Sequence, residues 1–196
     1  SVSGVGATQD ATVWLDLDED GSPDPFEPVT FTRMDGTFRL DVPGTLEAVG
    51  GLIRAQGGVD TTTGLPVHTV WSALPSSETR VTPITSIIAQ LVRRGLSTTA
   101  AELLSGAALR YSSVTDVTAL DHIAGSLADA TLAKDVLLAT SRVHHSVAIL
   151  QGLFSGATEA ASDNQAVQSI ISDAIHAALA DQLVQGRVDF ENPEDL

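Results

Sequence analysis

Residues 11–31 read ATVWLDLDEDGSPDPFEPVTF: an apolar run, an acidic stretch and a second apolar run. The two outer runs are rich in β-branched and aromatic residues, which favour strands. The residues between them are acidic or turn-forming. The sequence therefore predicts two strands joined by a charged loop.

The twelve residues of this loop, 16–27, have the spacing of a calcium-binding loop. If Asp16 is position 1, carboxylates fall at positions 1, 3, 5, 9 and 12, and glycine falls at position 6. Calcium takes six to eight oxygen ligands at about 2.3–2.6 Å, so alternate residues of a curling loop must point inward. The expected ligands are Asp16, Asp18, Asp20, the backbone carbonyl of Ser22, Asp24 and Glu27.

The flanks of the loop differ from those of a calcium sensor, whose loops lie between two helices. Here both flanks are β-like, and Pro23 and Pro25 stiffen the second half of the loop. Six acidic residues and no basic one occupy the twelve positions, so their repulsion would open the loop without a cation. We expect Glu19 to point outward and the loop to act as a structural calcium clip.

Further strands are predicted up to about residue 80. The dipeptide Asp35-Gly36 favours a tight turn, which predicts a hairpin of residues 29–33 with residues 37–40. Residues 52–55 and 67–73 are predicted to add two strands, separated by the Gly- and Pro-containing segment 57–66. Trp14 and Trp71, as strand residues, are expected in the core.

The composition and periodicity of the sequence change near residue 80, after which Ala, Leu, Ile and Ser recur at helical spacing. Thr82 followed by Pro83 predicts a helix start, and Gly95 its end. A second helix is predicted from about Thr99, with Glu102 at capping-box spacing. Two longer helices follow from apolar stripes, with His176 expected on the polar side of the last one. The stripes are Leu132, Val136, Ala139, Val143, Val147, Leu150 and Phe154, and then Val167, Ile170, Ile171, Ala174, Ile175, Ala178, Leu179 and Leu183.

Together these elements predict an α+β fold. A small antiparallel β part with an EF-hand-like calcium loop, residues 1–80, packs against an Ala/Leu-rich helical part, residues 81–196. The four other histidines, His68, His122, His144 and His145, are expected at the edge of solvent, with His68 on a strand. Arg93 and Arg94 are expected to complement the carbonyl end of the first helix.

Composition excludes several classes of function. The chain has 196 residues with 25 acidic and 10 basic side chains, a formal net charge of -15, which disfavours nucleic acid and anionic lipid as partners. No run approaches the roughly 20 apolar residues of a membrane span, so no membrane insertion is expected. The start, SVSGVGATQD, has neither Met nor a signal-peptide pattern, so we expect an excised or processed piece.

Two alternatives to a structural calcium module stay open. One is a peptide- or glycan-binding module with calcium shaping the rim of a cleft near Trp14, Trp71 or residues 57–66. The other is a magnesium-dependent phosphotransferase of the haloacid-dehalogenase type, with Asp16 as nucleophile and Asp18 as acid. Such enzymes have Thr or Val where this chain has Asp20, and a parallel sheet, which this sequence does not predict.

The chain resembles modules of large repetitive bacterial surface proteins, including RTX-type adhesins exported by type I secretion. The resemblance covers roughly residues 6–125 and is carried by GATQDATVWLDLDEDGSPDPFEP, MDGTFRL, GGVDTTTGLP, VTPITSIIAQLV and the weaker TDVTALD at 115–121. It implies a calcium site at Asp16, Asp18, Asp20, Asp24 and Glu27. It also implies a non-catalytic role outside the cell or on a bacterial surface, beside neighbouring modules of the same parent chain.

Overall fold

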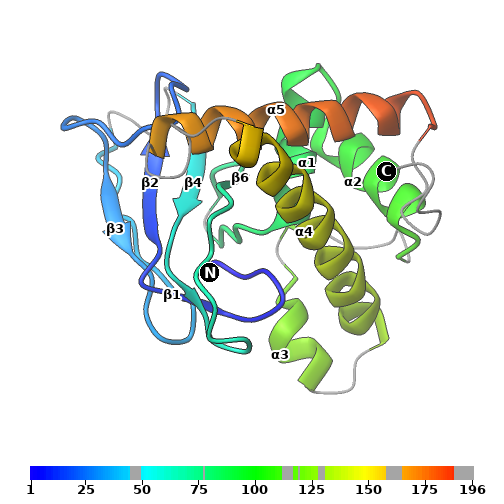
Figure 1. Cartoon of the computed structure of the whole chain (residues 1–196), viewed down its shortest axis with the longest axis horizontal. Helices are drawn as coiled ribbons and strands as arrows, with labels where there is room; N and C mark the ends of the chain where they lie inside the picture. Colours follow the sequence, from blue (N-terminus) through cyan, green and yellow to red (C-terminus); the bar gives the residue numbers. More distant parts are fainter. Residues whose placement is uncertain are drawn as a thin grey trace.

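The computed structural model describes residues 1–44, 50–76, 78–111, 117–118, 120–127, 131–157 and 165–187. The strands lie in the first part of the chain and the helices in the second, which confirms the α+β class (Figure 1). The strands are β1 (Thr8–Gln9), β2 (Thr12–Asp16), β3 (Val29–Phe31), β4 (Leu52–Gln56), β5 (Val59–Asp60) and β6 (Trp71–Ala73). The helices are α1 (Pro83–Arg93), α2 (Thr98–Leu109), α3 (His122–Leu127), α4 (Thr131–Ala157) and α5 (Gln165–Val184).

Four strands form an antiparallel sheet in the order β3-β2-β4-β6, and β1 pairs separately with β5. β2 lies between β3 and β4, with Trp14 opposite Arg54. Side chains of successive residues alternate between the two faces of a sheet. On one face lie Val13, Leu15, Ile53 and Ala55, in the core of the β part. The other face carries the buried side chains of Trp14, Asp16 and Arg54.

The predicted pairing of residues 29–33 with 37–40 is wrong, although the turn itself is confirmed. Gly36 has φ +73°, and its N–H donates to the Arg33 carbonyl at 2.9 Å. Residues 37–40, all within the described chain, form no strand, and β3 pairs with β2 instead. Phe38 and Leu40 pack against the apolar core of the sheet. Residues 37–40 therefore lie across the face of the sheet, where these side chains are partly buried, and do not extend along the edge strand β3.

The predicted strand at residues 67–73 is confirmed only for Trp71–Ala73. Before it, the Val67 N–H donates to the Gly58 carbonyl at 3.0 Å, and two further backbone groups bond to side chains of helices. The Val70 N–H donates to Ser172 Oγ at 3.2 Å, and the His68 carbonyl accepts from Gln151 Nε2 at 3.1 Å. His68 is therefore exposed in a loop, not on a strand as predicted. Both tryptophans are buried as expected, with 0% of Trp14 and 1% of Trp71 exposed.

The predicted start of α1 is confirmed. Thr82 is the N-cap, and its Oγ1 accepts from the Thr85 N–H at 3.1 Å, while Thr85 Oγ1 accepts from the Thr82 N–H at 2.8 Å. The predicted cap of the next helix is wrong. Ser97 caps α2, accepting from the Ala100 N–H at 3.2 Å, because Ser is as good an N-cap residue as Thr and lies earlier in the chain.

The buried residues of α1, α2, α4 and α5 form one apolar core built from Ala, Val, Ile and Leu. The predicted stripe of α4 is confirmed except at its end, where Phe154 is 55% exposed. The stripe of α5 is confirmed only in part, since Ile175, Leu179 and Leu183 are buried and Ile171 packs against the core. Ile170, Ala174 and Ala178 are exposed, and the buried positions are Ser169, Ser172, Ile175, His176, Leu179, Ala180 and Leu183.

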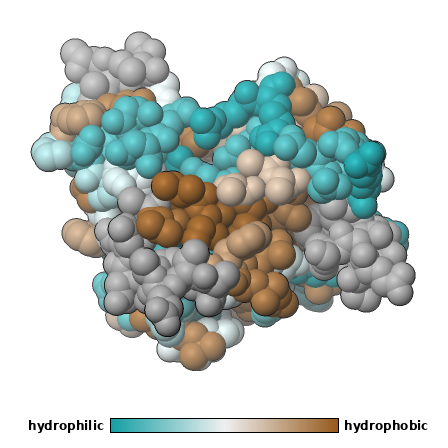
Figure 2. All heavy atoms as spheres, turned by 45° about the horizontal axis from the view of Figure 1, so that its top comes forward, coloured by the Kyte–Doolittle hydropathy of each residue, from teal (hydrophilic) through white to brown (hydrophobic). Residues whose placement is uncertain are grey.

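α5 runs from the β part to the helical part of the molecule (Figure 1). Near its beginning Asp173 pairs with Arg54 of β4, and Ser172 Oγ accepts the Val70 N–H. Hydrophobic residues gather in the middle of the surface on the α5 side (Figure 2). The large exposed apolar side chains of α4 and α5 are Leu138, Ile149, Leu153, Phe154, Ile170 and Val184. Within the described residues, no helix has the combined length and hydropathy of a membrane span.

Candidate metal centre

The loop of residues 16–27 connects the adjacent strands β2 and β3. Asp16 is the last residue of β2, and Gly21 turns the chain with φ +83°, in the left-handed region that glycine adopts without a Cβ penalty. Side-chain oxygens cap the turns of the loop. The Asp20 N–H donates to Asp18 Oδ1 at 3.2 Å, and the Ser22 N–H donates to Asp20 Oδ1 at 2.7 Å.

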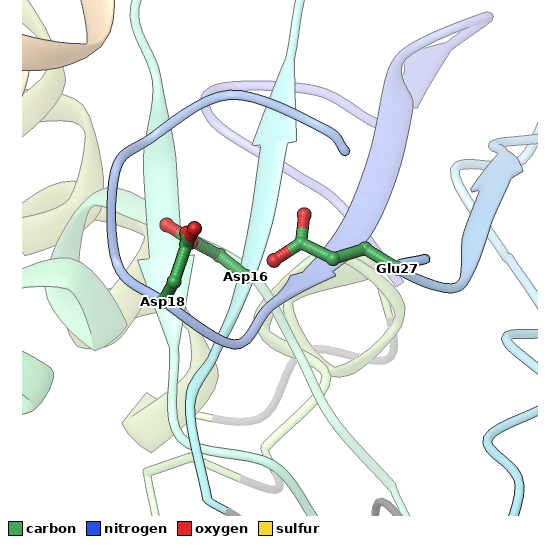
Figure 3. Close-up of side chains that lie close together, drawn as sticks. All are labelled: Asp16, Asp18 and Glu27. Carbon is green, nitrogen blue, oxygen red and sulfur yellow. The ribbon is translucent and has the colours of Figure 1, made fainter. Parts of the chain in front are cut away.

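The five predicted carboxylates come together in two overlapping groups. Oxygens of Asp16, Asp18 and Glu27 lie within 4.8 Å of one another, and so do oxygens of Asp18, Asp20 and Asp24. Asp18 belongs to both. The side chains of the first group point toward one another inside the curve of the loop (Figure 3). A ligand role for the Ser22 carbonyl stays a prediction, since the structure shows Ser22 only through its N–H bond to Asp20.

Asp16 is fully buried, with 0% of its area exposed. Its Oδ2 accepts from the Nε of Arg54 and, at 3.2 Å, from the Gly21 N–H. Its Oδ1 has no hydrogen-bond partner among the residues that the structure describes. Buried carboxylate oxygens are normally satisfied, because an unpaired one loses its hydration without compensation. One oxygen of Asp16 is thus held by Arg54 and Gly21, and the other is buried without a hydrogen bond from the described residues.

Glu27 closes the loop from the other end. Its Oε1 accepts from the Leu17 N–H at 2.6 Å and its Oε2 from the Asp24 N–H at 3.1 Å. Glu27 is 6% exposed, so these two bonds place its carboxylate against the start of the loop in a largely dry position. Each oxygen retains a second lone pair that a cation could use.

Burial is the main influence on the two inner carboxylates. It raises the pKa of Asp16, while the Arg54 guanidinium acts in the opposite direction. It also raises the pKa of Glu27, and the charges of Asp16 and Asp18 add to this effect. Ionisation of Asp16 and Glu27 is therefore disfavoured by their burial. An all-oxygen donor set with a buried, unpaired oxygen fits a hard divalent cation such as Ca²⁺.

Sequence reasoning missed the residues that support Asp16. Arg54 lies on β4, its side chain is 0% exposed, and its Nη1 pairs with Asp173 of α5 at 2.8 Å. The available signal was a single cation inside the apolar segment LIRA, since a buried arginine requires acidic partners. Gly21 also approaches α5, because a Cβ at Gly21 would collide with Ser169 Oγ.

The acidic residue predicted to point outward lies outside both carboxylate groups. Glu19 pairs with Arg93 at the end of α1. Arg94 donates from Nη1 to the Gln90 carbonyl at 3.1 Å, as expected for an arginine at a helix C-terminus, and from Nε to Asp181 at 2.5 Å.

One histidine predicted at the edge of solvent, His122, is buried instead, as is His176, which was predicted on the polar side of its helix. His122 is 3% exposed and His176 is 1% exposed. Burial lowers the pKa of both, that of His176 to about 4. His144 is half-buried against the ring of Trp71, and His145 is exposed as expected. None of these rings belongs to the carboxylate groups of the loop.

Searches with family models, curated proteins and solved structures found no match to the chain. The resemblance to bacterial surface modules therefore rests on the sequence motifs alone. One of those motifs, residues 115–121, lies partly outside the described residues.

Proposed function

We propose that the loop of residues 16–27 binds Ca²⁺ and that the chain is a non-catalytic, calcium-stabilised module of an extracellular bacterial surface protein. The calcium site is supported by the convergence of Asp16, Asp18 and Glu27, together with the buried Oδ1 of Asp16, which has no hydrogen-bond partner among the described residues. The surface-protein setting is supported by the sequence motifs. Calcium there is millimolar, which suits sites with dissociation constants of about 10⁻⁴–10⁻³ M.

Calcium would stabilise the fold by binding the folded state alone. At about 100 times the dissociation constant the free energy of unfolding rises by about 2.7 kcal/mol. For a chain of this size that corresponds to an increase in melting temperature of about 5–10 °C. Gly21 and the turns at Asp18 and Asp20 shape the loop beforehand, so little of the binding free energy is spent on ordering it.

Titration calorimetry and thermal melts in calcium, magnesium and chelator test this function. We expect one calcium site and a melting temperature that rises with calcium and less with magnesium. Asp18→Asn, in both carboxylate groups, should abolish the response. Asp41→Asn is the matched control, because Asp41 is exposed and paired with Arg39 away from the loop. A parent protein whose melting temperature is the same in calcium and chelator would refute the proposal.

The peptide- or glycan-binding alternative has mixed support. Its predicted platforms, Trp14 and Trp71, are both buried. A groove of about 1270 Å³ does lie on the face of the sheet that carries Leu15 and Ile53, between residues 37–42 and α3. Its lining includes Leu15, Phe38, Arg39, Ile53 and Ile123. Chemical-shift changes at these residues on adding peptide or oligosaccharide libraries would favour this second function.

The phosphotransferase alternative has less support. Its sheet would be parallel, whereas β3-β2-β4-β6 is antiparallel throughout. Its nucleophile, Asp16, is fully buried and paired with Arg54, so no substrate phosphorus could reach it in this arrangement. This alternative would be supported if the protein hydrolysed a generic phosphate ester with Mg²⁺ and the Asp16→Asn variant did not.

A further inference from the structure

We propose that calcium binding at the loop of residues 16–27 is coupled to the docking of α5 on the sheet, with Arg54 and the contact between Gly21 and Ser169 as the two links. This inference rests on the proposed calcium site. It adds a second element of the molecule, distant in sequence, that responds to the ion.

The first link is the shared guanidinium of Arg54. Its Nε pairs with Asp16, which is also the first predicted calcium ligand, and its Nη1 pairs with Asp173 of α5 at 2.8 Å. These partners lie 38 and 119 residues away in the sequence. A planar guanidinium holds two carboxylates in fixed directions, so a shift of either one changes the geometry available to the other.

The second link is steric. Gly21 occupies position 6 of the loop and lies so close to Ser169 that a Cβ there would collide with the serine hydroxyl. Ser169 is 1% exposed and lies one turn before Asp173 on α5. Opening of the acidic loop would move Gly21, and α5 would lose the surface on which Ser169 rests.

The sign of the coupling follows from the charges. Without calcium, Asp16 and Asp173 share the charge of Arg54, and the loop carboxylates repel one another. When calcium binds, Asp16 shares its charge between the ion and Arg54, so Arg54 depends more on Asp173. Calcium therefore favours the docked α5. By linkage, removing Asp173 leaves Arg54 as an under-compensated cation beside the ion and weakens calcium binding.

The beginning of α5 is also held by a polar contact beside the sheet and by part of the apolar core. Ser172 Oγ accepts the Val70 N–H at 3.2 Å just before β6, and Ile175 lies in the core of the helices. A helix end can open locally at a lower free energy than global unfolding. The beginning of α5 is thus a local unit whose opening an ion at the loop can bias.

The test compares Asp173→Asn with Asp181→Asn. Both remove one acidic charge from α5, but Asp181 pairs with Arg94 of α1 and lies two turns, about 12 Å, farther along the helix. Calorimetry should show calcium affinity reduced roughly fivefold or more in Asp173→Asn and changed less than about twofold in Asp181→Asn. Equal affinities in the two variants would overturn the coupling.

Hydrogen exchange supplies the second readout. In the parent, calcium should slow amide exchange in residues 167–176 at least about fivefold, and this response should disappear in Asp173→Asn. If the parent binds calcium while exchange in this segment is unchanged, the coupling is refuted and the calcium site stands. If the parent binds no calcium, the proposed function itself fails.

A steric variant covers the case in which Asp173→Asn does not fold. Ser169→Val, which crowds Gly21 without changing charge, should also weaken calcium binding by several-fold. Calcium affinity equal to that of the parent would remove the steric link.

Discussion

The two halves of α5 lie in different environments. In residues 167–176 the buried side chains are Ser169, Ser172, Ile175 and His176, and Asp173 pairs with Arg54. In residues 177–184 the buried side chains are Leu179, Ala180 and Leu183. The first half therefore docks through buried polar groups, a shared charge and Ile175, and the second mainly through apolar packing, with the partly exposed pair of Arg94 and Asp181 beside it.

One continuous helix thus joins a segment whose packing depends on a buried ion pair to a segment whose packing is mainly apolar. Apolar packing depends little on ions or pH, whereas a buried ion pair depends on the charge of everything near it. We therefore expect changes in the first half to respond to calcium and pH, and changes in the second half to reduce stability equally under all conditions.

The largest effect is expected from Arg54→Met. It leaves Asp16 buried without its cation and Asp173 without a partner, which should reduce the free energy of unfolding by about 3–5 kcal/mol in chelator. Urea unfolding measures the loss. Arg39→Met is the control, since Arg39 forms a highly exposed pair with Asp41 and should matter little. Equal stability of the two variants would show that the buried charge does not support the first half of α5.

Leu179→Ala tests the second half. Leu179 is 6% exposed in the apolar core, and its truncation should cost about 2–4 kcal/mol through lost burial and a cavity. The cost should be the same in calcium and in chelator. Val184→Ala, at a position 52% exposed, should have little effect. A Leu179→Ala loss that calcium changes would mean that the two halves are not independent.

His176 gives the first half a pH dependence. Burial lowers the pKa of its imidazole from 6.5 to about 4, so the unfolded chain takes up this proton at higher pH than the folded protein does. The free energy of unfolding should therefore fall as pH decreases from about 6.5 to 4, by up to about 3 kcal/mol. His176→Leu should flatten this part of the profile in denaturant titrations at a series of pH values. A variant whose profile runs parallel to the parent's would assign the dependence to other groups.

The smallest effect is expected from Ser172→Ala. It removes the acceptor of the buried Val70 N–H and should cost about 1–2 kcal/mol. Ser141→Ala is a matched control, because Ser141 Oγ bonds to the Leu137 carbonyl of its own helix and its removal leaves no orphaned donor elsewhere. Chemical unfolding of both variants measures the difference. If Ser172→Ala costs no more than Ser141→Ala, the bond to Val70 does not contribute to docking.

The loop could be predicted because its information is local. Spacing within twelve residues places the carboxylates, and the Asp35-Gly36 turn follows in the same way from two neighbours. Arg54 and Asp173 could not be assigned to Asp16, since they lie far along the chain and their pairing depends on how α5 crosses the sheet. The predicted pairing of β3 with residues 37–40 was wrong for a similar reason. Phe38 and Leu40 pack against the core of the sheet, so this segment does not lie beside β3 as a strand.

The face of α5 was not determined by its periodicity. Small residues such as Ala and Ser occur around most of the helix, so several faces satisfy the same period. The buried face keeps Ile175, Leu179 and Leu183 of the predicted stripe and adds polar residues beside them, among them His176. Sequence reasoning thus finds elements whose signals are contiguous and misses contacts made by single polar residues across the fold.

The short strand β3 has a consequence for how copies of this protein behave together in solution. It forms an edge of the sheet within the described chain, and Val29 and Phe31 are 45% and 63% exposed on it. An edge of this kind invites intermolecular strand addition and aggregation. It is only three residues long, Pro28 before it has no N–H to offer, and the acidic loop lies at its entrance. Like-charged loops would repel two such edges before they could align, so the same acidic residues favour solubility.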